Sequence, residues 1–278
     1  MANNIKHIIL DDVVFGNDKP FVFIGGPCQI EGEDHALMMA EKLVELTGKL
    51  NVPYIFKASF DKANRTSIHS KRGIGLKKSV PVFEKIKKEF GCKIVTDVHL
   101  PEQCAEIAPF VDILQVPAFL CRQTDLLEAV AKTGKVAEIK KGQFLSPDGM
   151  SKIIEKMKFF GNDNVLLVER GTSFGYNNLV VDMRGLDIMA KTGYPVIMDA
   201  THSVQMPGSL GESTGGDRHM ATILARAAIA SRPIAGIFCE VHNDPDNAFS
   251  DGPNSLTFEM TETLLKQLKE IDGLVKSF

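Results

Sequence analysis

The chain has 278 residues, of which 44% are hydrophobic and 24% are charged, as in an ordinary globular protein. The formal net charge of -3 gives no global field that would attract nucleic acid or an anionic membrane, so we expect neither as a partner. No apolar run approaches the roughly 20 residues that cross a bilayer, and the N-terminus lacks a signal-peptide core. We therefore expect a cytoplasmic protein, and its five widely spaced cysteines predict no disulfide framework.

The chain begins with a predicted β-hairpin over residues 5–16, in which two apolar triplets flank Asp11 and Asp12. Eight short apolar runs follow. Their hydrophobicity is continuous rather than alternating, which is typical of parallel strands covered on both faces. These predicted strands are residues 21–25, 54–58, 93–98, 113–117, 136–140, 165–170, 196–199 and 236–241.

A helical pattern follows each predicted strand. The predicted helices are residues 35–50, 80–90, 101–108, 123–132, 148–160, 182–191, 218–231 and 256–276. Eight such units in about 250 residues match an α/β fold of the (β/α)8 TIM-barrel type. We expect one domain over residues 1–278, with the hairpin of residues 1–16 closing the barrel bottom. A doubly wound sheet is the alternative, but no Gly-x-Gly-x-x-Gly motif follows the first strand.

The most informative segment is residues 57–67, directly after the second strand. It combines three cations, Lys57, Lys62 and Arg65, with small polar residues that include Ser59, Asn64, Thr66 and Ser67. This chemistry suits a doubly charged phosphate ester, although many charged loops are simply solvated.

Charged residues recur at the carboxyl ends of the other strands, where such barrels place their active sites. One set is cationic, and a ring of cations suits a substrate with several negative charges. Its members are Lys57, Lys62, Lys140 and Arg170, with Arg65 further out.

A second set comprises Cys28, His202, Glu240 and Asp251, and comes from strands one, seven and eight, which become neighbours when the barrel closes. A thiolate, an imidazole and two carboxylates favour a divalent-metal site. These donors admit Zn, Fe, Mn, Co or Cd. The alternatives are a buried thiol for Cys28 and a hydrogen-bonded strand-end residue for His202.

Two glycine-containing loops complete the candidates. Residues 171–178 follow strand six, where backbone N–H groups could approach an anion, although ordinary turns look the same. Residues 208–216 follow strand seven and are a candidate for a loop that closes over substrate, or for plain surface.

Several segments together resemble the 3-deoxy-D-manno-octulosonate 8-phosphate synthase family. They are Lys57-Ala58-Ser59-Phe60-Asp61-Lys62-Ala63-Asn64-Arg65, Thr96-Asp97-Val98-His99, Gln115-Val116-Pro117-Ala118-Phe119-Leu120, Gln123-Thr124-Asp125-Leu126, Asn177-Asn178-Leu179-Val180-Val181-Asp182-Met183 and Asp251-Gly252-Pro253. The related heptulosonate synthases carry a Lys-Pro-Arg-Thr-type motif where this chain has Ala-Asn-Arg.

The resemblance implies condensation of phosphoenolpyruvate with arabinose 5-phosphate, in lipopolysaccharide Kdo biosynthesis, by a homotetramer. It implies that Lys62, Lys140 and Arg170 hold phosphoenolpyruvate, with Lys57, Ser59 and Gln115 nearby. It further implies that Asn64, Arg65 and Thr66 bind the pentose phosphate. The expected catalytic set is Lys62, Lys140, His202 and Asp251.

The family has metal-dependent and metal-independent branches, and the latter carries Asn at the position of Cys28. The resemblance therefore implies a metal-dependent enzyme with Cys28, His202, Glu240 and Asp251 as ligands. Three alternatives stay open: a related synthase with another aldose acceptor, a Schiff-base aldolase using Lys140 as nucleophile, and a non-catalytic barrel that binds a sugar phosphate.

Overall fold

In the computed structural model, which describes residues 5–209 and 215–278, eight parallel strands close into a barrel in the order β11-β14-β3-β4-β5-β6-β7-β8. The strands are β3 (Val22–Gly26), β4 (Tyr54–Lys57), β5 (Lys93–Asp97), β6 (Ile113–Val116), β7 (Val136–Lys140), β8 (Val165–Glu169), β11 (Val196–Asp199) and β14 (Gly236–Glu240). Each matches a predicted strand to within one residue at either end. The prediction of a (β/α)8 barrel is confirmed.

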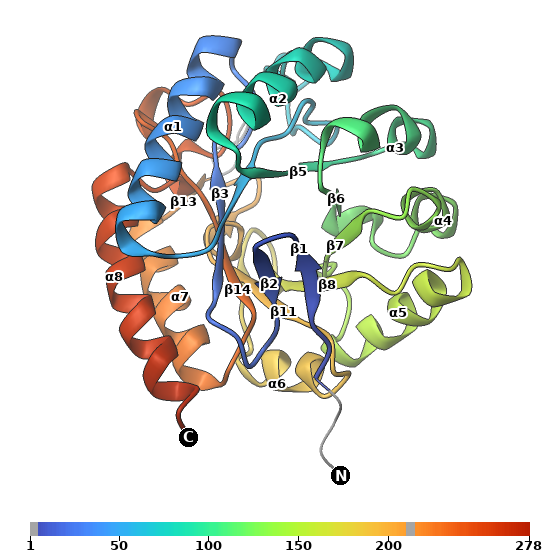
Figure 1. Ribbon diagram of the computed structural model, residues 1–278, viewed down its shortest axis with the longest axis vertical. Coiled ribbons are helices and arrows are strands. Elements are labelled where there is room, and N and C mark those ends of the chain that lie inside the picture. The colour runs from blue at the N-terminus through green and yellow to red at the C-terminus, as the bar shows by residue number, and fades with distance from the viewer. Residues whose placement is uncertain (1–4, 210–214) are drawn as a thin grey trace.

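The helices form a ring outside the strands (Figure 1). They are α1 (Glu33–Leu50), α2 (Leu76–Phe90), α3 (Pro101–Ile107), α4 (Thr124–Lys132), α5 (Met150–Phe159), α6 (Arg184–Ala190), α7 (Arg218–Ser231) and α8 (Phe258–Val275). Each turns one apolar stripe toward the sheet, as Leu126, Leu127 and Val130 do on α4.

Several predicted helix starts differ from the structure by one to four residues, and two of them show local features. Helix α8 begins two residues later than predicted because the Thr257 hydroxyl accepts the N–H of Met260 and caps it. Helix α2 begins at Leu76 rather than at Val80, with Ser79 donating to the carbonyl of Leu76 in its first turn and Pro81 inside the helix.

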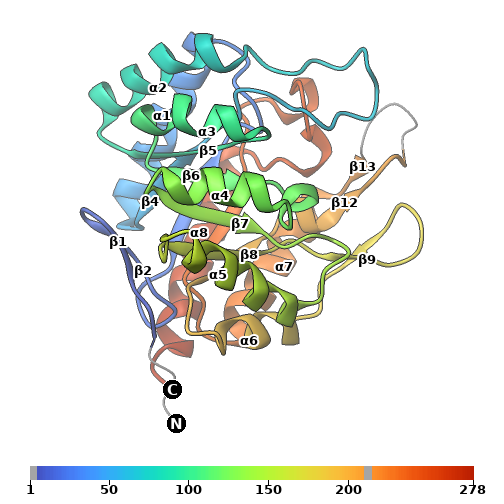
Figure 2. The same ribbon diagram turned by 90° about the vertical axis from the view of Figure 1, so that its right-hand side faces the viewer.

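The predicted hairpin is present and lies across the amino ends of the barrel strands. It consists of β1 (Ile8–Leu10) and β2 (Val13–Phe15), which pair antiparallel. Its buried side chains pack on the apolar interior of the barrel, against residues that include Val22, Ile113, Val136, Leu166 and Ile197. Figure 1 shows the hairpin in the middle of the ring, and Figure 2 shows it at the end opposite β9 (Thr172–Ser173) and β12 (Gln205–Met206).

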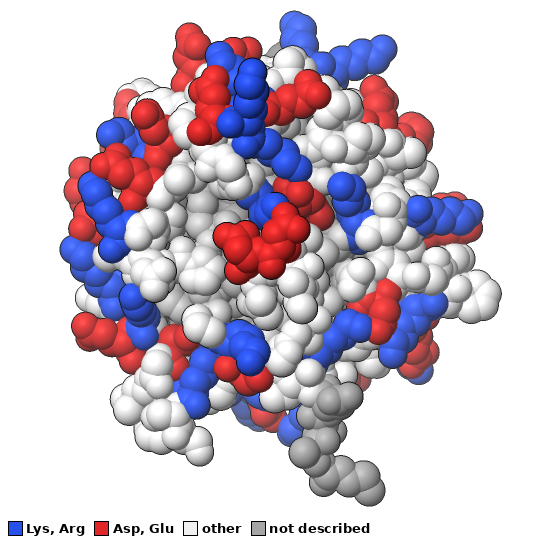
Figure 3. Space-filling view, viewed as in Figure 1, with Lys and Arg blue, Asp and Glu red and all other residues white. Residues whose placement is uncertain are grey.

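The space-filling view of this hairpin end shows acidic side chains over its middle and charges of both signs around the edge (Figure 3). The turn residues Asp11 and Asp12 are exposed, and Asp11 is paired with Lys93 at the start of β5. This end of the barrel therefore carries its charges outside and its apolar side chains inside.

At the other end the first two strands approach closely. A Cβ atom on Gly26 would lie 2.0 Å from the carbonyl oxygen of Lys57, so only glycine fits this position. This contact brings the loop after β3, with Cys28, close to the Lys57 strand end. No described helix is long and apolar enough to cross a membrane.

Candidate active site

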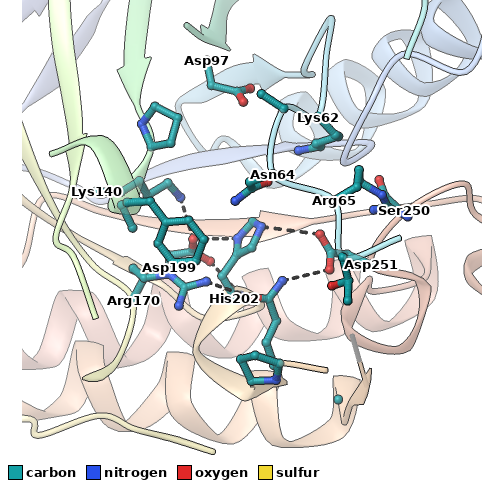
Figure 4. A pocket seen from close by; sticks show the side chains of 18 of the residues that line it. Lys62, Asn64, Arg65, Asp97, Lys140, Arg170, Asp199, His202, Ser250 and Asp251 are labelled. Carbon is teal, nitrogen blue, oxygen red and sulfur yellow. Dashed lines mark hydrogen bonds and ion pairs between the residues drawn. The ribbon is translucent and has the colours of Figure 1, made fainter. Parts of the chain in front are cut away.

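A cavity of about 1280 Å³ opens at the carboxyl ends of the strands (Figure 4). Most predicted site residues line it: Lys57, Lys62, Asn64, Arg65, Thr66, Gln115, Lys140, Arg170, His202 and Asp251. Cys28, Ser59 and Glu240 do not line the cavity, since all three are buried behind its wall. The barrel thus brings the predicted residues to one place, with some in contact with a ligand space and others supporting it.

Lys57 belongs to the supporting layer. Only 1% of this residue is exposed, and its Nζ lies 3.0 Å from Glu240 Oε1 and 3.1 Å from Ser59 Oγ. A third contact, 3.3 Å long, reaches the carbonyl oxygen of Cys28. Because its ammonium is already fully engaged, Lys57 fixes the wall rather than offering a free cation to the cavity.

Lys62 extends from the loop after β4 and donates to Ser59 Oγ at 2.8 Å. Ser59 in turn donates to Asp97, whose other oxygen lies 3.0 Å from His99 Nε2. Burial opposes ionisation of Asp97, but Lys62 and His99 outweigh it and hold the pKa of that carboxyl well below its usual range. The chain Lys62–Ser59–Asp97 therefore fixes a charged ammonium at the cavity.

Lys140, at the end of β7, is buried beside Asp199 at the end of β11. Its Nζ lies 2.5 Å from Asp199 Oδ2 and 3.3 Å from the centre of the Phe238 ring. Burial opposes ionisation of Asp199, but His202 and Lys140 lower the pKa of that carboxyl below its usual range. Because this amine already donates to a carboxylate, its geometry does not favour use as a Schiff-base nucleophile.

Arg170 follows β8 and reaches the cavity floor. Its Nη2 donates to Gln205 Oε1 at 2.7 Å, and Gln205 Nε2 donates to Asp251 Oδ1 at 2.8 Å. Its Nη1 is buried without a hydrogen-bond partner among the described residues. Figure 4 shows Arg170 on the same side of the cavity as Lys140, and an unpartnered guanidinium donor is suited to an anionic ligand.

Three of the four candidate metal ligands converge, and Glu240 lies beside them. Ligand atoms of Cys28, His202 and Asp251 all lie within 4.8 Å of one another. Cys28 Sγ lies 3.1 Å from Asp251 Oδ2, and His202 Nε2 lies 3.8 Å from that oxygen. Glu240 Oε1 lies 3.4 Å from His202 Nε2, and its Oε2 is buried without a partner in the described part of the chain.

The chemistry of this donor set fits a divalent metal. His202 Nδ1 lies 2.7 Å from Asp199 Oδ2, a neighbour that would place the ring proton on Nδ1 and leave Nε2 free to coordinate. Burial raises the pKa of the Cys28 thiol, so a bound cation is what would favour its thiolate. Metal binding here would therefore release a proton.

Asn64, Arg65 and Thr66 lie on the loop between β4 and α2 and line the cavity. Arg65 Nη2 donates to the carbonyl of Phe249 at 3.2 Å, and Figure 4 shows Arg65 beside Ser250 and away from Lys140. Positive charge is therefore available at two separated places in one cavity.

The glycine loops have different outcomes. The segment after β8 forms a small hairpin of β9 and β10 (Leu179–Val180) and is largely exposed. In the other, Gly215–Gly216 pairs with β12, while residues 210–214 lie outside the described residues.

Sequence reasoning assigned no site role to Asp199, Gln205 or Glu138, although Asp199 was visible as a strand-end carboxylate. It also missed a second group outside the cavity. The ligand atoms of Glu31, His35 and His242 lie within 4.8 Å of one another. The His242 Nδ1 accepts the N–H of Asp244 at 3.0 Å, so a neutral ring carries its proton on Nε2 and offers no second lone pair to a metal. This second cluster therefore holds loops together.

Residues 3–277 match the model of the DAHP synthetase I family. Among curated proteins, the chain is 59% identical over 271 residues to the 2-dehydro-3-deoxyphosphooctonate aldolase of Rickettsia canadensis (strain McKiel). It is 58% identical to the proteins of the same name from Rickettsia conorii and Rickettsia bellii. Each of these alignments covers 98% of both chains.

Proposed function

This chain belongs to the DAHP synthetase I family, and we propose that it condenses phosphoenolpyruvate with D-arabinose 5-phosphate and water. The products are 3-deoxy-D-manno-octulosonate 8-phosphate and phosphate, which makes the chain a carbon–carbon bond-forming transferase of Kdo biosynthesis. The observation that carries the proposal is one cavity with two separated cationic regions, in a chain 58–59% identical to the named aldolases.

The cationic region around Lys140 suits phosphoenolpyruvate. Lys62, Lys140 and the unpartnered Nη1 of Arg170 would hold its phosphate and carboxylate. Gln115 also lines this part of the cavity. Lys57 and Ser59 would not need to contact the substrate themselves. Lys57 holds Glu240 in place, and Ser59 accepts a hydrogen bond from Lys62.

The cationic region around Arg65 suits the pentose phosphate. Asn64, Arg65 and Thr66 lie together on one loop and line the cavity there. Arg65 would contribute the charge, while the Asn64 amide and the Thr66 hydroxyl would contribute neutral hydrogen bonds to phosphate oxygens. Arabinose 5-phosphate held by this loop would then present its aldehyde toward the region around Lys140.

The reaction needs two partners held in register. Carbon 3 of phosphoenolpyruvate bonds to the aldehyde carbon, water adds to carbon 2, and the aldehyde oxygen takes up a proton. Loss of phosphate then breaks the C–O bond of the original ester rather than the P–O bond. Fixed cations supply most of the orientation that this step requires.

We also assign the chain to the metal-dependent branch, with Cys28, His202, Glu240 and Asp251 as ligands of a divalent ion among Zn, Fe, Mn, Co and Cd. When bound, the ion would orient or polarise the aldehyde or place the water, and we favour orientation and water placement. His202 and Asp251, which face the cavity, would contact the reacting groups. A homotetramer remains part of the proposal, and analytical ultracentrifugation tests it.

The reaction is tested by phosphate release from phosphoenolpyruvate with arabinose 5-phosphate, before and after EDTA and with each divalent metal restored. We expect release that chelation abolishes and metal restores. Release only with erythrose 4-phosphate would move the acceptor to that of a heptulosonate synthase. A borohydride-trapped adduct on Lys140 would replace this mechanism by a Schiff-base aldolase.

The ligand set is tested by Cys28→Asn. Because the substitution removes the one thiolate and leaves only nitrogen and oxygen donors, we expect metal content to fall sharply. Mass-spectrometric metal analysis of the purified protein measures this directly, with Cys239→Ser as the control for a buried thiol on a neighbouring strand. Stoichiometric metal retained in Cys28→Asn would contradict the assignment.

A further inference from the structure

Glu138 is a buried carboxyl that the reaction proposed above does not use. It lies on β7 two residues before Lys140, so both side chains point into the barrel. Its neighbours in the strand ladder are Gln115 on β6 and Leu166 on β8. Glu138 is 0% exposed, and it therefore lies beneath the cavity floor.

No hydrogen-bond donor in the described part of the chain reaches either oxygen of Glu138. The nearest cation is Lys140, whose Nζ lies 3.9 Å from Glu138 Oε1. That ammonium is already paired with Asp199 at 2.5 Å. An ionised Glu138 would therefore be a second buried carboxylate competing for one cation, without a hydrogen bond of its own.

The charged groups that act on Glu138 come from four strands. Lys140 and Lys57 favour its ionised form, whereas Asp199 and Asp97 oppose it. Burial is the largest influence, and it raises the pKa of Glu138 to about 7. Small changes of charge above it would therefore change its protonation near neutral pH.

We propose that Glu138 is a positioning residue that takes up a proton from solvent when an anionic substrate binds to Lys140. This inference rests on the proposed function for the identity of that anion as phosphoenolpyruvate. The incoming anion adds negative charge beside Lys140 and competes with the carboxylates for its ammonium. Protonation of Glu138 removes one of those competitors, so Lys140 can turn to the substrate without a buried charge left unpaired.

The proposal predicts how affinity depends on pH. Above about pH 7 the free enzyme must gain a proton on binding, so affinity for phosphoenolpyruvate falls by up to about tenfold per pH unit. Glu138→Gln is already neutral and of the same shape, so it lacks this cost. We expect it to bind phosphoenolpyruvate on the order of tenfold more tightly than the wild type at about pH 8.5, and equally at about pH 6.

The experiment is isothermal titration of the metal-loaded protein with phosphoenolpyruvate alone, in two buffers of different ionisation enthalpy, across this pH range. Wild type and Glu138→Asp, which keeps an acid at this position, should take up a fraction of a proton that Glu138→Gln does not. Titration of the ligand itself is common to all three proteins and cancels in the comparison. Equal uptake in wild type and Glu138→Gln would overturn the proposal.

A second measurement needs no variant. Infrared difference spectroscopy of the wild type should show a protonated carboxyl band that grows when phosphoenolpyruvate binds at about pH 8, which is above the pKa of Glu138 in the free enzyme. Absence of that growth would overturn the proposal even where Glu138→Gln does not fold.

Failure of this inference and failure of the proposed function are separable. Wild-type turnover without Glu138-dependent proton uptake keeps the function and overturns the role of Glu138. Proton uptake that depends on Glu138, in a protein with no phosphate release, overturns the function and keeps that role. No binding of either phosphoenolpyruvate or inorganic phosphate overturns both.

Discussion

The two ends of the barrel use the same strands for opposite purposes. On β4, β5 and β11, an aliphatic interior residue is followed two positions later by a charged one: Ile55 and Lys57, Val95 and Asp97, Ile197 and Asp199. The amino end is closed by an apolar hairpin, and the carboxyl end opens into a charged cavity. One strand thus supplies both core and site, separated by a single step of the pleat.

The difference lies in how each end meets the cost of burial. At the hairpin end, removal of apolar surface from water stabilises the fold directly. At the cavity end, buried charges are stable only because they are paired, as Lys57 is with Glu240 and Lys140 with Asp199. Stability should therefore be sensitive to volume at one end, and activity to charge at the other.

The largest expected effect comes from a substitution at the apolar, hairpin end of the barrel. Phe15 is fully buried in β2, and Phe15→Ala should reduce the free energy of unfolding by about 3–5 kcal/mol through lost burial and a cavity. Urea unfolding measures it. The kcat of the remaining folded protein should be unchanged, because Phe15 lies at the end away from the cavity.

The matched control is Ile9→Ala on the paired strand of the hairpin, a residue that is already 67% exposed. It should leave the unfolding free energy close to that of the wild type. A large loss of kcat in Phe15→Ala at unchanged fold would contradict the division of labour between the two ends.

The next largest effect comes from removing a charge at the cavity end of the barrel. Lys62→Met keeps a long apolar stem but removes the ammonium, and kcat/KM should fall by about 10²–10³-fold, as when one preorganised donor to a developing charge is removed. Steady-state phosphate release measures the change. Lys78→Met, an exposed lysine on α2, is the control and should retain wild-type kinetics. Equal loss in both variants would point to a general charge effect.

A smaller effect sharpens the comparison through pH. The depressed pKa of Asp97 means that its carboxylate stabilises the folded state above its ordinary pKa, and that this contribution is lost as pH falls through the folded-state value. Asp97→Asn should therefore reduce the unfolding free energy by about 1–3 kcal/mol at neutral pH, and by less below about pH 4. Urea unfolding at several pH values checks this. A difference independent of pH would mean that packing, not charge, holds Asp97.

The fold was predictable because its signals are local. Continuous apolar runs with polar ends located every barrel strand to within one residue. The missed first turn of α2 shows the limit of this approach, since Leu76, Lys77 and Lys78 carry no apolar periodicity of their own and the turn depends on its context.

The site was predictable in membership but not in pairing. Placement of Cys28, His202 and Asp251 near one another followed from strand order, whereas the partnership of Lys140 with Asp199 depends on the register across a closed barrel. Glu138 lay hidden inside a predicted apolar strand. The roles assigned to individual residues, and the metal, stay predictions until the variants above are measured.

The most direct test of the central claim is turnover of phosphoenolpyruvate and arabinose 5-phosphate in water enriched in ¹⁸O, with both products examined by mass spectrometry. The account predicts label at carbon 2 of the eight-carbon product and none in the released phosphate, because water attacks carbon and the C–O bond breaks. Label in the phosphate, with an unlabelled sugar product, would contradict it.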